Sequence, residues 1–498
     1  MASVALDQLR ALFASNPEKV VTLPSTDENK TKTDESESSP ANAYQAAVTT
    51  AWSQTCWTAA AGYIYLNTVE ELTSALAIIR NTNTKFAVRT TGHNPNAGFS
   101  SAGEEALVLD IGQFKSRELI PATDGVSSAI ARVGAGNTWG EVYAWLEEQG
   151  LSAIGGRDQQ VGLGGFLLGG GMGALPNLYG LGSDGVKNFE VLLADGKLIN
   201  ANANENPALY RALKGGGSNF GIVTRFDLET HPLIKVQYTI NLYNLEDHSA
   251  INQATMDVQE AMESDPKIGL FTNFNNGYVA VGLLYGDHPA EPPKAFAPFH
   301  NLKLVSTVTP TTNGTLLSLA KVMGHAQTPQ KRCICTATTR ISHDLYEEVN
   351  KVWVEVCKTL PPDAVLHYTI QPFGKAGVHA GKDRGENIMG LASVPQTWWV
   401  FTCEWTTPKD GSDSDNAAAD AAAQKAVATM AKTVHFLASA KGVLLDYKCM
   451  SFATASQKTL GSYGAENVQR MREAAATYDP EGVFQNLQNG GFLLHNNV

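Results

Sequence analysis

Short apolar runs alternate with amphipathic stretches along the first half of the chain, which predicts small strands and helices in turn. Thr68 and Glu71 have the spacing of a capping box, and so do Thr138 and Glu141, so each pair marks the start of a helix. Gly150 marks the end of the second helix. The strands predicted in this half are Lys85–Val88, Leu107–Ile111, Ala129–Val133, Phe189–Ala194 and Lys197–Ala201.

The second half of the chain has apolar strand-like runs separated by long helical patterns. Several strands and helices in one contiguous stretch predict an antiparallel sheet that helices cover on one face. After it, a helix is expected over Glu466–Thr477 and a short segment at Phe484–Gln488. The predicted strands are Val236–Leu242, Gly269–Phe274, Tyr278–Tyr285, Leu366–Gln371 and Trp398–Trp405, and the predicted helices cover residues 249–264, 314–323, 343–360 and 415–439.

Together these patterns predict an α+β fold in three segments. We expect residues 1–233 to form one domain and residues 234–445 a second, because glycine clusters become rare after His231 and Pro232. Residues 446–498 are expected to return to the first domain as a C-terminal segment.

The charge balance narrows the class of partner. The chain has a net charge of −12 and no run of Lys and Arg, which argues against nucleic acid or an anionic membrane surface. No apolar run is long enough to span a bilayer, and the N-terminus resembles an amphipathic helix more than a signal peptide. We expect a cytoplasmic protein, or a secreted one if a signal peptide was removed. The six cysteines lack zinc-ligand spacing, so no metal site is expected.

The stretch 85–101 runs from a predicted strand into a loop of small residues that contains Gly92, Asn94 and Gly98. Such a loop suits an anion, because glycines let backbone N–H groups approach it closely. His93 at its centre is not explained by anion binding. The alternative interpretation is an ordinary surface turn with a solvated histidine.

A second glycine-rich stretch covers residues 154–173. It lacks the spacing and context of a dinucleotide-binding fingerprint, and no Lys follows a glycine as a P-loop requires. The stretch indicates that backbone runs very close to a neighbouring group over a long distance. The alternative interpretation is tight packing of turns against one another.

Taken together, the two stretches resemble those of FAD-dependent oxidases of the vanillyl-alcohol oxidase type, and more narrowly the berberine-bridge-enzyme-like branch of the fungal type. The resemblance is carried by RTTGH at residues 89–93 and by VGLGGFLLGGGMG at residues 161–173, and it continues through residues 179–184, 193–196, 215–224, 462–467 and 478–480. It implies a two-domain flavoprotein. Its FAD-binding domain would consist of two small α+β subdomains, beside a substrate domain with an antiparallel sheet.

The resemblance also implies which residues hold the cofactor. His93 matches the histidine that bonds covalently to the 8α-methyl group of FAD. Asp158 stands where many members carry a cysteine that bonds to flavin C6, and a carboxylate cannot form that thioether, so single attachment through His93 is expected. The other residues expected to line the cofactor are Arg89, Thr91, Gly92, Asn94, Gly98, Val161, Gly162, Gly165, Gly169, Gly170, Gly173, Gly221, Ile222 and Val223.

The substrate side departs from the family pattern, because the customary acid and base groups are missing or moved and Met172 stands where a tyrosine is common. Strand alternation would place His367 and Gln371 on one face, His367 as a base and Gln371 as a hydrogen-bonding group. Glu404 is a third catalytic candidate. The alternatives are a hydrogen-bonded sheet histidine at His367 and a solvated or paired carboxylate at Glu404.

The resemblance implies an FAD-dependent oxidase that takes a hydride from an alcohol, an amine or a related C–H site of an apolar secondary metabolite. Oxidative cyclisation could accompany that step, and O₂ would reoxidise the flavin to give peroxide. The alternative is a cyclase that holds a flavin without net redox turnover. A third hypothesis is a non-enzymatic binding module. The expected partners are a small-molecule substrate and O₂, and the oligomeric state is not predicted.

Overall fold

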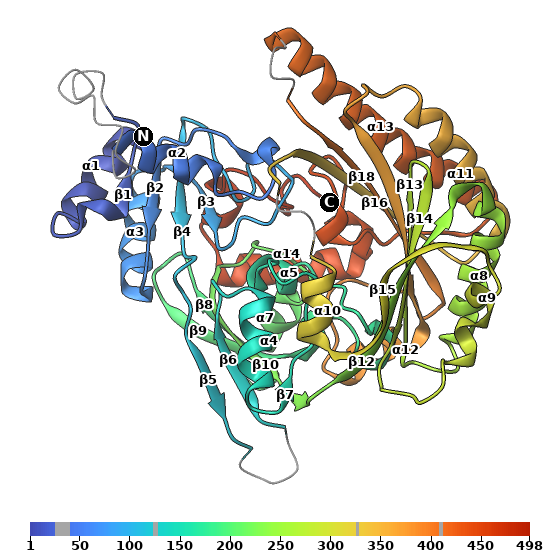
Figure 1. Cartoon of the computed structure of the whole chain (residues 1–498). Helices are drawn as coiled ribbons and strands as arrows, with labels where there is room; N and C mark the ends of the chain where they lie inside the picture. The colour runs from blue at the N-terminus through green and yellow to red at the C-terminus, as the bar shows by residue number, and fades with distance from the viewer. Residues whose placement is uncertain (25–39, 123–127, 325–327, 408–411) are drawn as a thin grey trace.

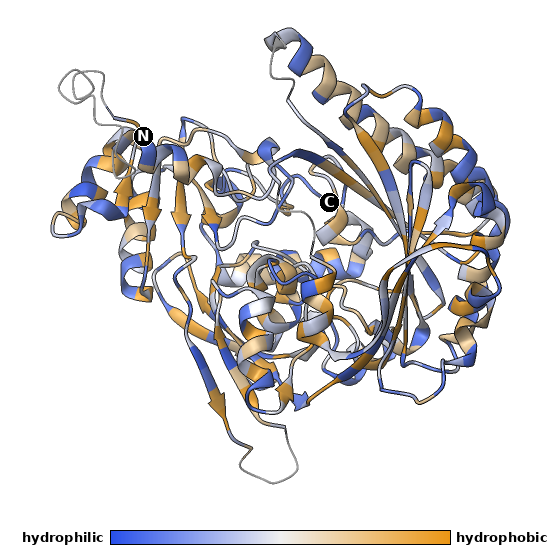
Figure 2. Ribbon diagram, in the orientation of Figure 1, coloured by the Kyte–Doolittle hydropathy of each residue, from blue (hydrophilic) through white to orange (hydrophobic). Residues whose placement is uncertain are grey.

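Three main β-sheets organise the chain, two small ones in the first half and a large one in the second (Figure 1). The computed structural model describes residues 1–24, 40–122, 128–324, 328–407 and 412–498. Figure 2 shows many strands as largely hydrophobic, with hydrophilic residues concentrated on loops and on the outer sides of helices. The mixture of helices and mainly antiparallel strands confirms the predicted α+β fold class.

The first sheet has the order β1-β2-β4-β3, with β2, β4 and β3 parallel and β1 antiparallel to β2. Helix α3 connects β2 to β3 and begins after Thr68, whose hydroxyl accepts a hydrogen bond from the backbone N–H of Glu71, as the sequence predicts. The elements of this unit are α1 (Ala2–Leu12), β1 (Val20–Val21), α2 (Pro40–Thr49), β2 (Gly62–Tyr65), α3 (Val69–Asn81), β3 (Lys85–Arg89) and β4 (Ala106–Asp110).

The second sheet is antiparallel throughout, in the order β5-β6-β10-β8-β9. The predicted capping box of Thr138 and Glu141 is present at the start of α4. The strands are β5 (Arg117–Ile120), β6 (Ile130–Gly134), β8 (Val186–Leu192), β9 (Leu198–Asn202) and β10 (Ile222–Glu229), and β7 (Leu151–Ser152) pairs with β11 (His231–Pro232). The helices of this unit are α4 (Trp139–Glu147), α5 (Leu163–Leu168), α6 (Pro176–Tyr179) and α7 (Pro207–Leu213).

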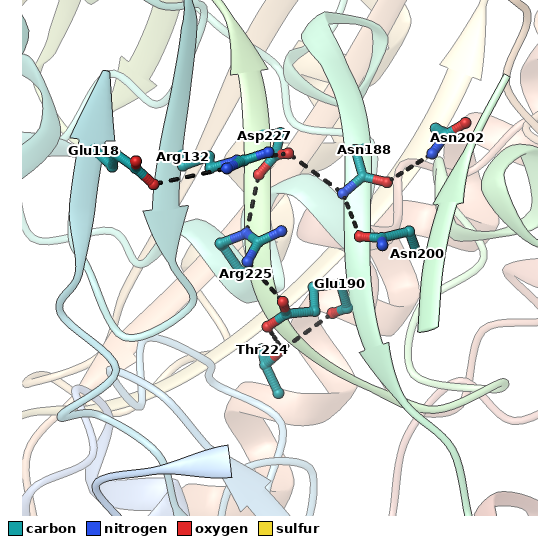
Figure 3. Close-up of polar contacts among 9 residues, drawn as sticks. All are labelled: Glu118, Arg132, Asn188, Glu190, Asn200, Asn202, Thr224, Arg225 and Asp227. Atoms are coloured by element: carbon teal, nitrogen blue, oxygen red, sulfur yellow. Dashed lines mark hydrogen bonds and ion pairs between the residues drawn. The ribbon is translucent and has the colours of Figure 1, made fainter. Parts of the chain in front are cut away.

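The two faces of the second sheet differ in polarity. Phe189 and Phe226 are fully buried on one face. The other face carries a ladder of ion pairs and amide hydrogen bonds (Figure 3), in which Asp227 accepts hydrogen bonds from Arg132 at 3.3 Å and Arg225 at 3.0 Å. The ladder links the strands from β5 to β9, so the polar side chains of this face bind one another. The apolar face packs into the core.

The large sheet has eight strands in the order β15-β12-β14-β13-β17-β18-β16-β19, and every neighbouring pair is antiparallel. Helices α8, α9, α11 and α13 lie along its outer side (Figure 1). The strands are β12 (Lys235–Asn244), β13 (Ile268–Asn275), β14 (Tyr278–Tyr285), β15 (Leu304–Thr315), β16 (Lys331–Thr339), β17 (Val365–Phe373), β18 (Gln396–Trp405) and β19 (Leu444–Leu445). The helices are α8 (His248–Ala261), α9 (Ala297–His300), α10 (Leu316–Val322), α11 (His343–Cys357), α12 (Lys375–Asp383) and α13 (Asp413–Ala440).

Alternation along β17 separates a core face from a second face of the large sheet. The Tyr368 ring is fully buried, stacks on Phe274 at 4.5 Å between centroids, and meets Trp353 of α11 edge-on at 5.3 Å. Burying one such ring stabilises the fold by roughly 1.5–3 kcal/mol. Thr369 and Gln371, one residue to either side of Ile370, therefore lie on the opposite face, away from these helices.

The C-terminal segment returns to the first sheet. The backbone N–H of Phe86 donates to the carbonyl of Leu487 at 2.9 Å, and Asn489 N–H donates to the carbonyl of Phe86 at 2.7 Å. These bonds extend the first sheet beside β3. They support our proposal that 1–233, 234–445 and 446–498 are the structural divisions of the chain. The helices of the segment are α14 (Ala465–Tyr478) and α15 (Val483–Asn486).

Strand β15 escaped prediction, and β16 was expected only as a strand that carries Cys333 and Cys335. Strand β15 has mostly exposed side chains and carries many threonines, so it lacks the apolar signal of a strand. Strand β16 mixes Cys, Thr and basic residues, although the Cys333-Ile-Cys335 spacing does fall on a strand. Both strands have polar or mixed sequences. Pairing with neighbouring strands, and not a hydrophobic run of their own, determines their conformation.

Candidate functional site

The loop of residues 90–101 begins where β3 ends. Gly92 has φ of +71° and Gly98 has φ of +86°, conformations that favour glycine. Beneath the loop, the buried Arg89 side chain donates to Asp110 Oδ2 at 2.6 Å and to the carbonyl of Ala47 at 2.7 Å. Arg89 thus ties β3 to β4 at the point from which the loop departs, a structural task that is compatible with holding a cofactor loop.

Distant segments hold the loop in place. Asn96 Nδ2 donates to the carbonyl of Ala453 at 3.0 Å, and Asn96 Oδ1 accepts from the N–H of Ala455 at 2.9 Å. On the other side, Asn489 Nδ2 donates to the carbonyl of Gly98 at 3.0 Å. The C-terminal segment therefore fixes the shape of a loop that lies some 350 residues earlier in the chain.

The His93 ring is one layer of a stack. It lies parallel to the Trp52 ring, with centroids 4.3 Å apart and an interplanar angle of 12°. The guanidinium carbon of Arg332 lies 4.1 Å from the centroid of the Trp52 ring. Arg332 Nε in turn donates to Glu404 Oε1 at 2.7 Å. Residues from β16 and β18 of the large sheet thus determine where the imidazole of the first half is held.

The glycine-rich stretch touches the same loop. A Cβ on Gly162 would lie 2.3 Å from Thr91 Oγ1, and a Cβ on Gly164 would lie 3.3 Å from Thr90 Cγ2. Gly165, by contrast, faces open space, with no heavy atom within 4 Å of a Cβ built there. Ser100 Oγ is buried and makes no hydrogen bond to any described residue. Closely packed glycines beside an open backbone surface and an unsatisfied hydroxyl fit an extended polar cofactor such as FAD.

A Gly162→Ala variant should lose bound flavin. Its methyl group would overlap Thr91, and overpacking of this kind costs about 1–3 kcal/mol. The loop has to move to relieve the overlap, so we expect a lower ratio of flavin to protein absorbance after purification. Adding Thr91→Ala should restore part of the flavin, because only the Thr91 Cβ, 3.1 Å away, would remain nearby. The Thr91→Ala single variant is the control, and a double variant no better than Gly162→Ala would contradict the packing argument.

A polar face of the large sheet carries the catalytic candidate His367. Asn275 Nδ2 donates to Asn273 Oδ1 at 2.5 Å, which turns Asn273 Nδ2 toward His367 Nδ1 at 3.1 Å and Thr369 Oγ1 at 2.7 Å. An amide nitrogen only donates, so His367 Nδ1 accepts and the neutral ring carries its proton on Nε2. In this arrangement His367 can donate a hydrogen bond through Nε2. It is less suited to act as a base, because a base would accept a proton at Nδ1, which already accepts from Asn273.

Gln371 lies on the same face and contacts an arginine of the glycine-rich stretch. Arg157 Nη2 donates to Gln371 Oε1 at 2.5 Å. Beside Gln371 on β18, Trp398 stacks on Phe373 at 4.9 Å and contacts Tyr447 at 5.0 Å between ring centroids. Near Gln371, this face of the sheet therefore carries a partly buried cation beside a cluster of buried aromatic rings.

Two ends of one sheet face carry the two halves of the candidate site. Glu404, which anchors the stack under His93, and Trp398 lie six residues apart on β18, on the same face, or roughly 20 Å at the strand rise of about 3.3 Å. His367 and Thr369 lie on the neighbouring strand between them. The structure thus brings His93, His367, Gln371 and Glu404 to one side of the large sheet.

The remaining predicted residues lie along the glycine-rich stretch and on β10. Asp158 is buried and accepts from the N–H of Gln160 at 2.8 Å. A Cβ on Gly221 would meet Val191 Cγ1 at 2.5 Å. Each of the others packs closely against neighbouring backbone or side chains, namely Val161 at the start of α4, Gly169 beside Ser451, Gly170 beside Met389, Gly173 beside Gly155, and Ile222 and Val223 against β8.

Sequence reasoning missed Trp52, Arg157 and Arg332. Trp52 lies in an irregular segment without periodicity, and Arg332 lies on β16 just before the Cys333–Cys335 part that was expected as a strand. Arg157 stands inside the glycine-rich stretch, between Gly156 and Asp158. A charged residue in such a stretch could have indicated a site residue. Within the described part of the chain, no cluster of His, Cys, Asp and Glu could hold a metal ion, and no helix combines the length and apolarity that crossing a membrane demands.

Comparisons with known proteins show which proteins this chain is similar to in sequence and in fold. Residues 60–202 match the family described as "FAD binding domain". The chain is 33% identical over 452 residues to an FAD-dependent monooxygenase of Arthrobotrys oligospora, covering 90% of this chain and 85% of that protein. Its structure is similar to that of Physcomitrella patens BBE-like 1, with a TM-score of 0.72, 16% identity and coverage of 98% and 99%. It is also similar to the xylooligosaccharide oxidase of Myceliophthora thermophila, with a TM-score of 0.73, 19% identity and coverage of 97% and 98%.

Proposed function

We propose an oxidation reaction for this chain, which belongs to the vanillyl-alcohol oxidase superfamily of FAD-dependent oxidoreductases. The proposed reaction oxidises a small apolar metabolite at an alcohol, amine or related C–H site. When bound, FAD supplies the two-electron chemistry and passes the electrons to O₂. The observation that carries the proposal is that the His93 loop and the face bearing His367 and Gln371 lie on one side of the large sheet.

We propose that FAD is attached once, through a bond between the His93 imidazole and the 8α-carbon. The stack on Trp52 supports this proposal, since it holds the ring in one orientation. Gly92 and Gly98 shape the loop around it, and Thr91 meets Gly162 of the glycine-rich stretch. Asp158 offers no thiol for a second bond.

The chain's own side chains would bind and orient the substrate. Trp398 and Phe373, both fully buried, form an aromatic backing behind Gln371, and such apolar surroundings suit an apolar or aromatic substrate. Gln371 is fixed by Arg157 and can hydrogen-bond the substrate through its amide nitrogen. His367, with its proton on Nε2, is proposed to donate a hydrogen bond that positions the reacting group, in place of the base role expected from the sequence alone.

Anaerobic mixing tests the proposed oxidation. The purified protein is mixed without O₂ with a panel of benzylic and allylic alcohols and secondary amines, and the flavin absorbance is followed. Bleaching by a panel member, followed by peroxide formation when O₂ is admitted, is the expected result. A His367→Ala variant should lower the bleaching rate by about 10–100-fold, since a positioned donor is lost. An unchanged rate would remove His367 from the reaction.

The same experiment separates the alternatives. A cyclase that holds flavin without redox turnover would convert a polyene substrate with no bleaching, and that outcome would replace the oxidase proposal. The monooxygenase name of the Arthrobotrys relative suggests a further outcome, in which an oxygen atom enters the product. Reaction under isotopically heavy O₂ distinguishes this outcome, because an oxidase leaves the product unlabelled.

A further inference from the structure

Arg157 is a cation set into the interior of the candidate site. It belongs to the loop before α5, and its Nη2 donates to Gln371 Oε1 at 2.5 Å. The Arg157 side chain is partly buried. Burial lowers the pKa of its guanidinium to about 10, so it is still a cation at neutral pH.

No negative charge in the described chain balances this cation. Gln371 is a neutral amide, and no described carboxylate forms an ion pair with Arg157. Cys449, which interacts with Arg157 electrostatically, is itself buried, which raises the pKa of the thiol to about 12. Burial also raises the pKa of Tyr447 well above its usual value. Both groups are therefore neutral at pH 7, and a partly buried cation without a paired anion gains from a ligand that supplies one.

The surroundings of Arg157 indicate what kind of anion would fit. Gln371 and Trp398 are direct neighbours across β17 and β18, and Trp398 is fully buried between Phe373 and Tyr447. A planar guanidinium matches a carboxylate or an enolate in geometry, and the aromatic rings match a flat carbon skeleton. The cation and the aromatic cluster are thus joined through Gln371, which contacts Arg157 and pairs with Trp398 across the two strands.

We propose that Arg157 is the anion-binding residue of the substrate subsite, and that the substrate presents an acidic oxygen, as a carboxylate, phenolate or enolate, on a flat apolar skeleton. This inference rests on the proposed function, because it assigns the substrate of the same site. Arg157 binds the acidic oxygen, and Gln371 holds the guanidinium in place while its own amide nitrogen faces the ligand.

Matched ligands test the charge preference. The purified holoprotein is titrated with benzoate and with benzamide, which share a shape and differ in charge, and binding is followed by flavin absorbance and by tryptophan fluorescence. Wild-type protein is expected to bind benzoate at least about tenfold more tightly, as a charge-assisted hydrogen bond implies. The Arg157→Gln variant should bind both ligands equally. Arg340, which is exposed, provides the Arg340→Gln control with the wild-type preference.

A second variant tests the same inference without removing the arginine. Gln371→Glu would place a carboxylate 2.5 Å from Arg157 Nη2, where the amide oxygen now lies. That internal anion should abolish the preference for benzoate even though the cation is retained. It also keeps the test decisive if Arg157→Gln does not fold.

Three outcomes would overturn the inference. They are equal binding of benzoate and benzamide by wild-type protein, a preference that persists in Arg157→Gln, and loss of flavin from Arg157→Gln, which would assign the cation to the cofactor. A failure of the proposed function would look different, because it would appear as a protein without flavin or without anaerobic bleaching. The preference for benzoate can still be measured on such a protein by tryptophan fluorescence.

Discussion

A His93→Ala variant is expected to release all of its flavin when the protein is denatured in acid, whereas wild-type protein is expected to stay yellow. The reason is chemical, because alanine has no nucleophilic atom to bond the 8α-carbon. Noncovalent flavin should persist in part, since Gly92, Gly98 and the glycine-rich stretch still shape the remaining contacts. The measurement is flavin fluorescence of the polypeptide band on a denaturing gel, with free flavin counted in the acid supernatant.

His435 supplies the matched control, because it is an exposed histidine of α13 far along the chain. His435→Ala should keep acid-stable flavin at the wild-type amount. Wild-type protein that releases its flavin in acid would contradict covalent attachment altogether. A His93→Ala protein that keeps acid-stable flavin would move the attachment to another residue. An Asp158→Cys variant extends the test, since we expect a thiol there to permit a second bond to the flavin.

Replacing Arg332 by methionine is expected to lower the fraction of covalently attached flavin strongly. The variant removes the cation over the Trp52 ring, a contact worth about 1–2 kcal/mol. It also removes the partner of Glu404 and the donor to the Trp52 carbonyl, at 2.9 Å. Trp52 would then be held less rigidly, and His93 with it. Acid-stable flavin per protein is the readout, and thermal unfolding reports the accompanying loss of stability, about 1–3 kcal/mol.

Variants of Glu404 decide whether this carboxylate acts on the substrate or through the stack. Glu404→Gln keeps an oxygen to accept from Arg332 Nε, so a positioning role predicts nearly normal flavin attachment and a normal rate of anaerobic bleaching per attached flavin. Glu404→Ala removes the acceptor and should lower attachment. A catalytic role also predicts nearly full attachment for Glu404→Gln, but with a greatly reduced rate of bleaching per attached flavin. That result would return Glu404 to the catalytic group.

Local sequence was a good guide wherever adjacent residues determine the structure. The capping pairs at Thr68 and Thr138 place two helices because each side chain bonds the backbone three residues away. Alternation places Tyr368 in the core and Gln371 on the other face, because side chains in a strand point to opposite sides. Strand β15 was missed because an exposed, threonine-rich edge strand has no hydrophobic signal of its own.

For the candidate site, local sequence was enough to locate the loop of residues 90–101 and the glycine-rich stretch, since their glycines must stand at fixed positions for backbone to turn and approach closely. The side chains that surround them depend on tertiary packing. Trp52, His93, Arg332 and Glu404 come from four separate segments, and nothing in their spacing indicates that they stack. Arg157 likewise meets Gln371 across 214 residues of chain. Such contacts depend on how sheets and loops pack over long sequence separations. Residues adjacent in the sequence carry no pattern that predicts them.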